Sequence, residues 1–269
     1  RGVLPDALQR KIPARRPVGP LPTPAAQSRH VLMLTSCVQG AMMPTIDAAT
    51  LRVLDAIGIS ARYAPDGGCC GAVNFHLDAQ DAALVQMKAN IDAWWPLVET
   101  GTIEAIVMNA SGCGAMVKEY AHHLRHEPDY AQRAERIVSL VKDIAEIVAP
   151  HAPALRERLS AGAQVAFHPP CTLQHWQGLR PLSEKVLVEL GFELLPFTES
   201  HLCCGSAGTY SVLNPEIALA LRNRKLDAIA PVQPEMILSS NMGCIGHLQS
   251  GTQTPVRHWI EAVDERLSA

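Results

Sequence analysis

The sequence predicts an α/β protein of two duplicated lobes, each a small, parallel-rich sheet flanked by helices, related by a pseudo-two-fold repeat. Three observations support this fold class. One cysteine pattern occurs twice, strand-like apolar runs alternate with helical segments, and the 269 residues exceed one typical domain of about 150 residues. Alternating strands and helices favour parallel sheets, because a parallel connection needs a crossover that is usually a helix.

The cysteine repeat defines the two lobes. The Cys-Cys-Gly triplet at Cys69 returns at Cys203, and in both copies a lone cysteine precedes the pair by 32 residues and a Gly-Cys step follows it. The first copy holds Cys37, Cys69, Cys70 and Cys113, and the second holds Cys171, Cys203, Cys204 and Cys244. We expect a proline-rich linker over residues 1–29, a first cysteine-rich domain over 30–150 and a second over 151–269.

In the first lobe, short apolar runs predict strands over residues 30–36, 59–64 and 103–109. Apolar residues at helical spacing, each set followed by a glycine, predict helices over 45–57 and 79–99. Strands and helices therefore alternate along this half of the chain.

The second lobe follows the same order. We expect strands over residues 164–168, 192–197 and 236–240, with helices over 181–190 and 215–229. Two further helices are predicted. One, over residues 129–149, joins the lobes, and the other, over 256–267, ends the chain.

The lone cysteines of each lobe follow the ends of predicted strands. In open α/β sheets, binding sites gather at the carboxyl edge of the strands. The four thiols of each lobe should therefore converge at one edge of their sheet.

Composition limits the partners of the chain. Its net charge of −3 argues against nucleic acid as a main partner. No apolar run reaches the roughly 18 residues that a membrane span needs, and no signal peptide is visible. We expect a cytoplasmic protein, with peripheral contact on the cytoplasmic face of the inner membrane as an option. Because the sequence begins with arginine instead of Met, we expect a fragment or a processed chain.

The vicinal pairs argue against structural disulfides. Adjacent Cα atoms lie ~3.8 Å apart, whereas disulfides prefer about 4.4–6.8 Å. Four thiols at one edge instead form a soft ligand set, which suits an iron–sulfur cluster or zinc. Two alternatives stay open: a zinc-stapled docking scaffold, and a thiol–disulfide enzyme that uses either pair. Four glycines lie beside the cysteines and would let the backbone pass close to an inorganic core. They are Gly71, Gly112, Gly205 and Gly243.

The duplicated pattern resembles the cysteine-rich (CCG) domain of heterodisulfide reductases. Four strings further resemble the iron–sulfur subunits of bacterial glycolate oxidases: NIDAWWP (90–96), ASGCGAMVKEY (110–120), HLCCGSAGTY (201–210) and VRHWIE (256–261). The resemblance implies an iron–sulfur cluster, of the 4Fe-4S type, held by the eight cysteines, with zinc as an alternative in one lobe. It also implies electron transfer from a flavin subunit, which oxidises glycolate to glyoxylate, toward the respiratory chain. The alternative is the iron–sulfur subunit of a lactate or glycerol-3-phosphate dehydrogenase.

Two departures from the resembled families are visible. The N-terminal ferredoxin-like domain of glycolate oxidase iron–sulfur subunits is missing here, so the chain looks like the C-terminal part of such a subunit. The heterodisulfide reductase pattern ends in Cys-x-x-Cys, but Met116 and His247 occupy the last position in the two copies. We expect Met116 to fill the core. His247 is either an additional nitrogen ligand or a hydrogen-bonded histidine near a strand end.

Four more histidines lie near cysteines in the sequence: His76, His168, His175 and His201. A histidine within reach of a thiol lowers the thiol pKa. A structural or surface role is the simpler expectation for each of them.

Overall fold

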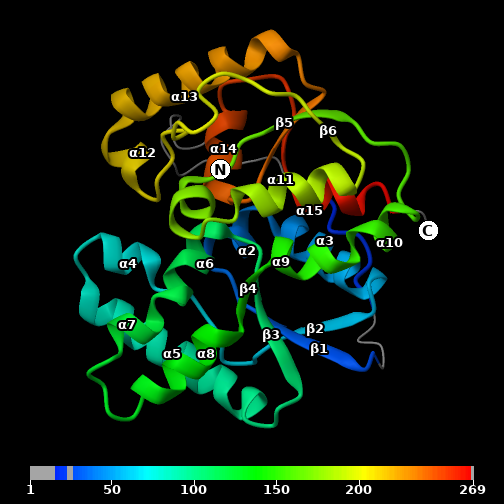
Figure 1. The fold of residues 1–269 in the computed structure, drawn as a ribbon. Helices are drawn as coiled ribbons and strands as arrows, with labels where there is room; N and C mark the ends of the chain where they lie inside the picture. Colours follow the sequence, from blue (N-terminus) through cyan, green and yellow to red (C-terminus); the bar gives the residue numbers. More distant parts are fainter. Residues whose placement is uncertain (1–15, 23–26, 268–269) are drawn as a thin grey trace.

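Two four-stranded parallel sheets form the framework of the chain. The computed structural model describes residues 16–22 and 27–267. The strand orders are β2-β1-β3-β4 and β6-β5-β7-β8, and every strand pair within the two sheets is parallel. The second order repeats the first, with each strand number raised by four. The predicted fold class is confirmed, and Figure 1 shows one lobe above the other.

The first lobe contains β1 (Arg29–Met33), α2 (Val38–Met42), α3 (Pro44–Ala56), β2 (Ile59–Tyr63), α4 (Ala72–His76), α5 (Gln80–Val98), β3 (Ile103–Met108), α6 (Ser111–Lys118), α7 (Tyr120–His123), α8 (Ala131–Leu140), β4 (Val141–Asp143) and α9 (Ile144–Val148). The connection to the second lobe is made by η1 (Ala149–His151) and α10 (Ala152–Arg156). The second lobe contains β5 (Gln164–Phe167), η2 (Thr172–Trp176), α11 (Arg180–Glu189), β6 (Glu193–Leu194), α12 (Tyr210–Leu213), α13 (Pro215–Ile229), η3 (Ala230–Val232), β7 (Met236–Ser239), α14 (Met242–Gln249), β8 (Val256–His258) and α15 (Trp259–Asp264).

Two of the helices predicted from the sequence are wrong, because each of the two segments contains a strand. Residues 129–149 form α8, then the strand β4, then α9, because Val141–Asp143 pairs with β3. Residues 256–267 begin with β8, which pairs with β7, and only Trp259–Asp264 is helical. A strand of three residues is too short to show a period of two in the sequence. The strand predicted over 192–197 is present only at Glu193–Leu194.

A capping box follows each of these missed strands. The Asp143 side chain accepts a hydrogen bond from the Ala145 amide at 2.9 Å, and Glu146 bonds back to the Asp143 amide. His258 and Glu261 form the same arrangement at the start of α15. The caps satisfy helix N–H groups and turn the chain sharply from strand to helix.

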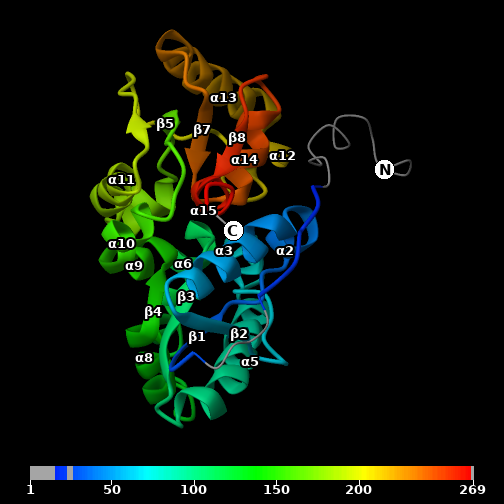
Figure 2. The same ribbon diagram turned by 90° about the vertical axis from the view of Figure 1, so that its right-hand side faces the viewer.

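The lobes share a core. One cluster of buried side chains includes Val31 and Ile46 of the first lobe together with Val165 and Trp259 of the second. α15 packs against α3 of the first lobe, and α9 packs against α11 of the second. Figure 2 shows these helices between the two sheets. Separating the lobes would therefore expose apolar surface on both.

Polar contacts reinforce the same boundary. Arg52 of α3 forms a bidentate ion pair with Asp264 of α15, and its Nη1 also donates to the carbonyl of Val18. The Arg16 guanidinium donates a hydrogen bond to the Glu261 carboxylate at 2.5 Å. The described part of the expected linker thus lies against both lobes, while residues 1–15 and 23–26 of it fall outside the described residues.

The glycine after each cysteine pair has a left-handed backbone. Gly71 and Gly205 both have φ of 89°. A Cβ on Gly205 would lie 2.4 Å from the carbonyl oxygen of Ala218, and one on Gly71 would lie 3.2 Å from that of Ala83. Conformation and close approach to a helix therefore require glycine at both positions.

We expect Gly205→Ala to destabilise the protein more than Gly71→Ala does. The left-handed conformation alone costs roughly 1–2 kcal/mol for alanine, and Gly205→Ala must also displace a backbone carbonyl. Chemical denaturation would measure the free energy of unfolding of both variants. Gly68→Ala is the control, because no atom lies within 4 Å of its added Cβ. Equal losses in all three variants would contradict this explanation.

A pH dependence is expected from Asp143, which is 2% exposed. Burial raises its pKa to about 7, above the unfolded value of about 3.9. Because the folded state holds this proton more tightly, the stability it contributes is complete below pH ~4 and is lost as the pH rises through 7. Asp143→Asn keeps a capping oxygen and cannot ionise. Denaturation between pH 5 and 8 should show a flatter profile for this variant, and parallel profiles would refute the assignment.

Candidate metal centres

The four thiols of the first lobe lie together. The Cys37 and Cys69 sulfur atoms are 3.4 Å apart. Side-chain hydrogen bonds then connect Cys69 to Cys70 and Cys70 to Cys113. Cys37 is exposed and Cys70 is buried, so the set runs from the surface to the core.

The second lobe repeats this chain of contacts. Cys171 contacts Cys203, Cys203 contacts Cys204, and Cys204 contacts Cys244. All eight cysteines are free. The structure therefore brings together each expected set of four, while metal binding by them stays a prediction.

Helix starts position the lone cysteines. Cys37 is the N-cap of α2, and Cys171 is the N-cap of η2. Cys113 and Cys244 are the third residues of α6 and α14, respectively. These helices begin after the carboxyl ends of their strands, so their N–H groups and positive dipole ends lie near the sulfurs and favour thiolates.

Asn90 and Tyr120 hold the cysteine pair of the first lobe. The Asn90 side chain donates to the carbonyl of Cys69 at 2.9 Å, and the Tyr120 hydroxyl donates to the carbonyl of Cys70 at 2.9 Å. Both side chains are fully buried. Sequence reasoning missed both residues: Asn90 lies on a predicted helix and Tyr120 in no predicted element, and neither gave a sign that its side chain reaches the pair.

Lys225 occupies the place of Asn90 in the second lobe. Its ammonium donates to the carbonyls of Glu199 and Ser200 at 2.6 and 3.1 Å, which fixes the loop before Cys203. Burial lowers the pKa of Lys225 to about 8, and the thiols of the second lobe oppose this shift. A buried cation therefore accompanies one thiol set, and a neutral amide accompanies the other.

Contacts within each set shift the pKa values of its thiols. Burial raises the pKa of Cys37, and a hydrogen bond to Cys113 raises that of Cys70. In the second lobe, hydrogen bonds to Cys203 raise the pKa of Cys171 and of Cys204, while the pKa of Cys203 falls because both donate to it. The pKa of Cys244 falls to about 6, chiefly through a hydrogen bond from Cys204 and also through the nearby imidazole of His168.

The remaining predicted positions lie around these sets. A Cβ added to Gly112 would lie 3.0 Å from Asn241 Nδ2, and one added to Gly243 would lie 2.9 Å from Ser206 Oγ. Met116 is 5% exposed and belongs to the core of the first lobe, as expected. His247 Nε2 lies 3.0 Å from the carbonyl oxygen of Ala218, in line with the hydrogen-bonded alternative.

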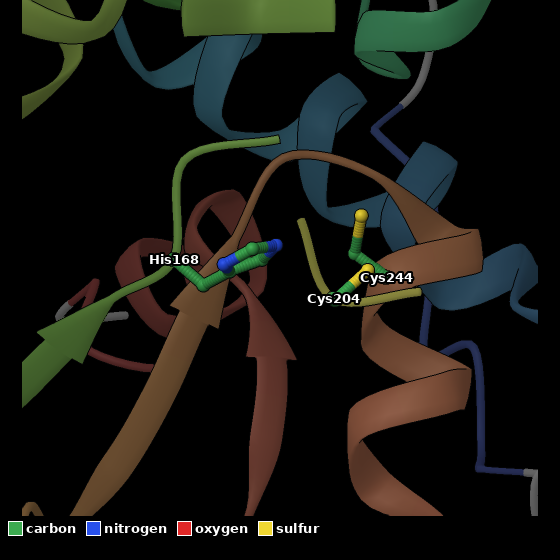
Figure 3. Close-up of side chains that lie close together, drawn as sticks. All are labelled: His168, Cys204 and Cys244. Atoms are coloured by element: carbon green, nitrogen blue, oxygen red, sulfur yellow. The ribbon is translucent and has the colours of Figure 1, made fainter. Parts of the chain in front are cut away.

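His168 joins the second set. One atom each from His168, Cys204 and Cys244 lie within 4.8 Å of one another, and all three residues are buried. Figure 3 shows the imidazole directed toward the two sulfurs. The expected structural or surface role for this histidine did not include such a contact. Its place three residues before Cys171 was the available sequence signal.

The two sets meet at the boundary between the lobes. The Ser111 amide, at the start of α6, donates to the Ser240 carbonyl at 3.0 Å. The Asn241 side chain, at the start of α14, donates to the Ser111 hydroxyl at 3.2 Å. Because Cys113 and Cys244 lie in the first turns of these helices, one hydrogen-bonded junction links both thiol sets.

The donor chemistry fits a soft metal or an iron–sulfur cluster. Each set offers four sulfur atoms, and thiolates prefer such metals over hard cations. A disulfide framework would leave no ligands, but no disulfide joins any of the eight cysteines. None of the described helices is long and apolar enough to cross a membrane.

Known proteins resemble this chain over most of its length. The glycolate oxidase iron–sulfur subunit of Escherichia coli (strain K12) is 46% identical over 267 residues, which cover 99% of this chain and 65% of that protein. The probable glycolate oxidase iron–sulfur subunit of Bacillus subtilis (strain 168) is 27% identical over 255 residues, or 93% and 56% of the two chains. The chain thus spans less than two thirds of both relatives.

A shorter relative matches along its full length. Lactate utilization protein A of Geobacillus thermodenitrificans (strain NG80-2) is 23% identical over 246 residues, which cover 88% of this chain and 99% of that protein. The family pattern described as the CCG cysteine-rich domain matches twice, at residues 31–118 and 165–249. These two matches contain all eight cysteines and cover more than half of the sequence. The chain belongs to the CCG cysteine-rich domain family.

Proposed function

We propose that this chain is the electron-transfer part of the iron–sulfur subunit of a glycolate-oxidising complex. The observation that carries the proposal is the pair of four-thiol sets, each gathered at helix starts on the carboxyl edge of a parallel sheet. The 46% identity to a glycolate oxidase iron–sulfur subunit supports it. We assign the cofactor as an iron–sulfur cluster of the 4Fe-4S type.

The residues of the chain would hold such a cofactor and set its surroundings. The ligands are Cys37, Cys69, Cys70 and Cys113 in the first lobe, and Cys171, Cys203, Cys204 and Cys244 in the second. When bound, the cofactor supplies one-electron redox chemistry. Asn90 and Tyr120 orient the first cysteine pair through its carbonyls. The dipoles of α6 and α14 stabilise negative charge on the sulfurs.

Substrate oxidation belongs to a partner in this proposal. A flavin subunit would oxidise glycolate to glyoxylate and pass electrons to this chain, and from here they would move toward the respiratory chain. A ferredoxin-like domain would precede the two lobes in the complete subunit. Free thiols suit a reducing compartment, so the proposed location is cytoplasmic, on or near the inner membrane.

Lactate oxidation is the second candidate. The match to the relative named for lactate utilization covers 99% of that protein and 88% of this chain, so it extends over both lobes of this chain. Its identity of 23% is half that to the glycolate oxidase subunit, which is why glycolate is proposed first.

Cys70→Ser and Cys204→Ser should each remove the metal of one lobe. The two thiols are 3% and 1% exposed and hold the same motif position, so each variant is the matched control for the other. Each loaded lobe should contain about four irons and four sulfides. Iron, zinc and acid-labile sulfide analysis of the anaerobic protein should therefore show about half of the wild-type iron in each variant. Zinc without sulfide would favour the docking scaffold, and wild-type protein without metal would favour thiol chemistry.

The substrate can be identified by following the absorbance of the flavin and of the iron–sulfur centres in the complete complex. Glycolate should reduce both, whereas in Cys70→Ser and Cys204→Ser the flavin should still be reduced and transfer to an external acceptor should fall at least about tenfold. Stopped-flow absorbance separates these steps. Reduction by lactate or glycerol 3-phosphate, but not by glycolate, would replace the proposed substrate.

A further inference from the structure

The imidazole of His168 is fully buried and has no oxygen or nitrogen partner. The residue has 0% exposure, neither ring nitrogen bonds to an oxygen or nitrogen atom within the described part of the chain, and the ring interacts with the Cys244 thiol. Buried polar groups in proteins are almost always bonded, and those that are not often face a bound ion or water. The position of the ring is therefore informative.

Three parts of the second lobe bring the side chains of His168, Cys204 and Cys244 to one point. His168 follows β5, Cys204 precedes the left-handed Gly205, and Cys244 lies in the first turn of α14. Their ligand atoms lie within 4.8 Å of one another (Figure 3). Donors in tetrahedral geometry around a single zinc or iron, with bonds of about 2.0–2.3 Å, lie roughly 3.3–3.8 Å apart, so a single ion needs only a small contraction.

The backbone holds His168 firmly in this position. Its amide donates to the Leu238 carbonyl at 2.8 Å, and its carbonyl accepts from the Ser239 hydroxyl at 2.9 Å. Both bonds join it to β7, beside the start of α14. The sheet therefore fixes the backbone from which the ring projects.

Among the described residues of the first lobe, the position equivalent to His168 carries no nitrogen donor. Leu34 lies three residues before Cys37, as His168 lies three residues before Cys171. Leu34 is 5% exposed and packs in the core of the first lobe. The duplicated sites thus differ in one donor atom.

We propose that His168 provides a nitrogen ligand to the metal centre of the second lobe, beside Cys204 and Cys244, while the first lobe binds through sulfur alone. The inference rests on the proposed function and deepens it. Imidazole nitrogen is an established ligand in place of thiolate in some iron–sulfur centres and in zinc sites, and in the former it raises the reduction potential. The second centre is then the better electron acceptor of the two.

Pulsed EPR on the anaerobic full chain tests this ligand. A centre with a bound imidazole should show nitrogen coupling that changes when histidine is labelled with ¹⁵N. The coupling should vanish in His168→Leu, which installs the residue of the first lobe. It should persist in His247→Met, the matched control, because Met116 is the first-lobe equivalent of His247.

A second variant keeps the test independent of folding. His168→Cys supplies sulfur in place of nitrogen, so metal content should stay at the wild-type level while the nitrogen coupling disappears. The midpoint potential of this centre, followed by EPR during redox titration, should shift to a lower value.

The outcomes separate the inference from the proposed function. Iron and sulfide in the second lobe without imidazole coupling, or with coupling that survives His168→Leu, overturns the ligand and leaves the function standing. Zinc in this lobe without sulfide overturns its role as a relay. X-ray absorption at the zinc edge then supports His168 if a nitrogen neighbour at about 2.0–2.1 Å is lost in His168→Leu, and an all-sulfur shell overturns it. Protein without any metal overturns both.

Discussion

The convergence of thiols at the carboxyl edges of two parallel sheets is the constraint on which the rest of the structure depends. Each lone cysteine caps or begins a helix directly after a strand, and each pair is turned into place by a left-handed glycine. Gathering several ionisable groups in a partly dry site is costly. The helix starts offset part of this cost, and a bound metal would offset more, since it deprotonates its thiol ligands.

The sequence predicted the duplication and the convergence, because a cysteine repeat in register is visible without a structure. It did not reveal β4 and β8, which are three residues long and hold their place through pairing with β3 and β7. Their likeness is visible in hindsight: Val141–Glu146 reads VKDIAE and Val256–Glu261 reads VRHWIE. The shared core was also out of reach, because the packing of α15 against α3 depends on how the lobes meet.

The site shows the same limit. The eight cysteines were found because their chemistry is specific, whereas Asn90 and Lys225 were missed because amides and amines on helices are ordinary. The repeat offered a route to both of them. Ile91-Asp92-Ala93 and Leu226-Asp227-Ala228 mark equivalent helices, and Asn90 and Lys225 directly precede these segments. Comparing the copies position by position would have shown a polar residue at this place in both helices, although neither its burial nor what it touches.

The divergence between the copies is as informative as their similarity. Leu34 and Asn90 in the first lobe correspond to His168 and Lys225 in the second, so the same thiol scaffold has different electrostatic surroundings. The hydrogen bonds of Lys225 go to neutral carbonyls, and the thiols of the second set contribute to keeping it charged. A buried cation is stable only beside negative charge. We therefore expect the thiols of the second set to carry more negative charge than those of the first. A relay of two identical sites has no preferred direction. Unequal sites joined at the Ser111–Ser240 junction would give it one, with the electron settling in the second lobe.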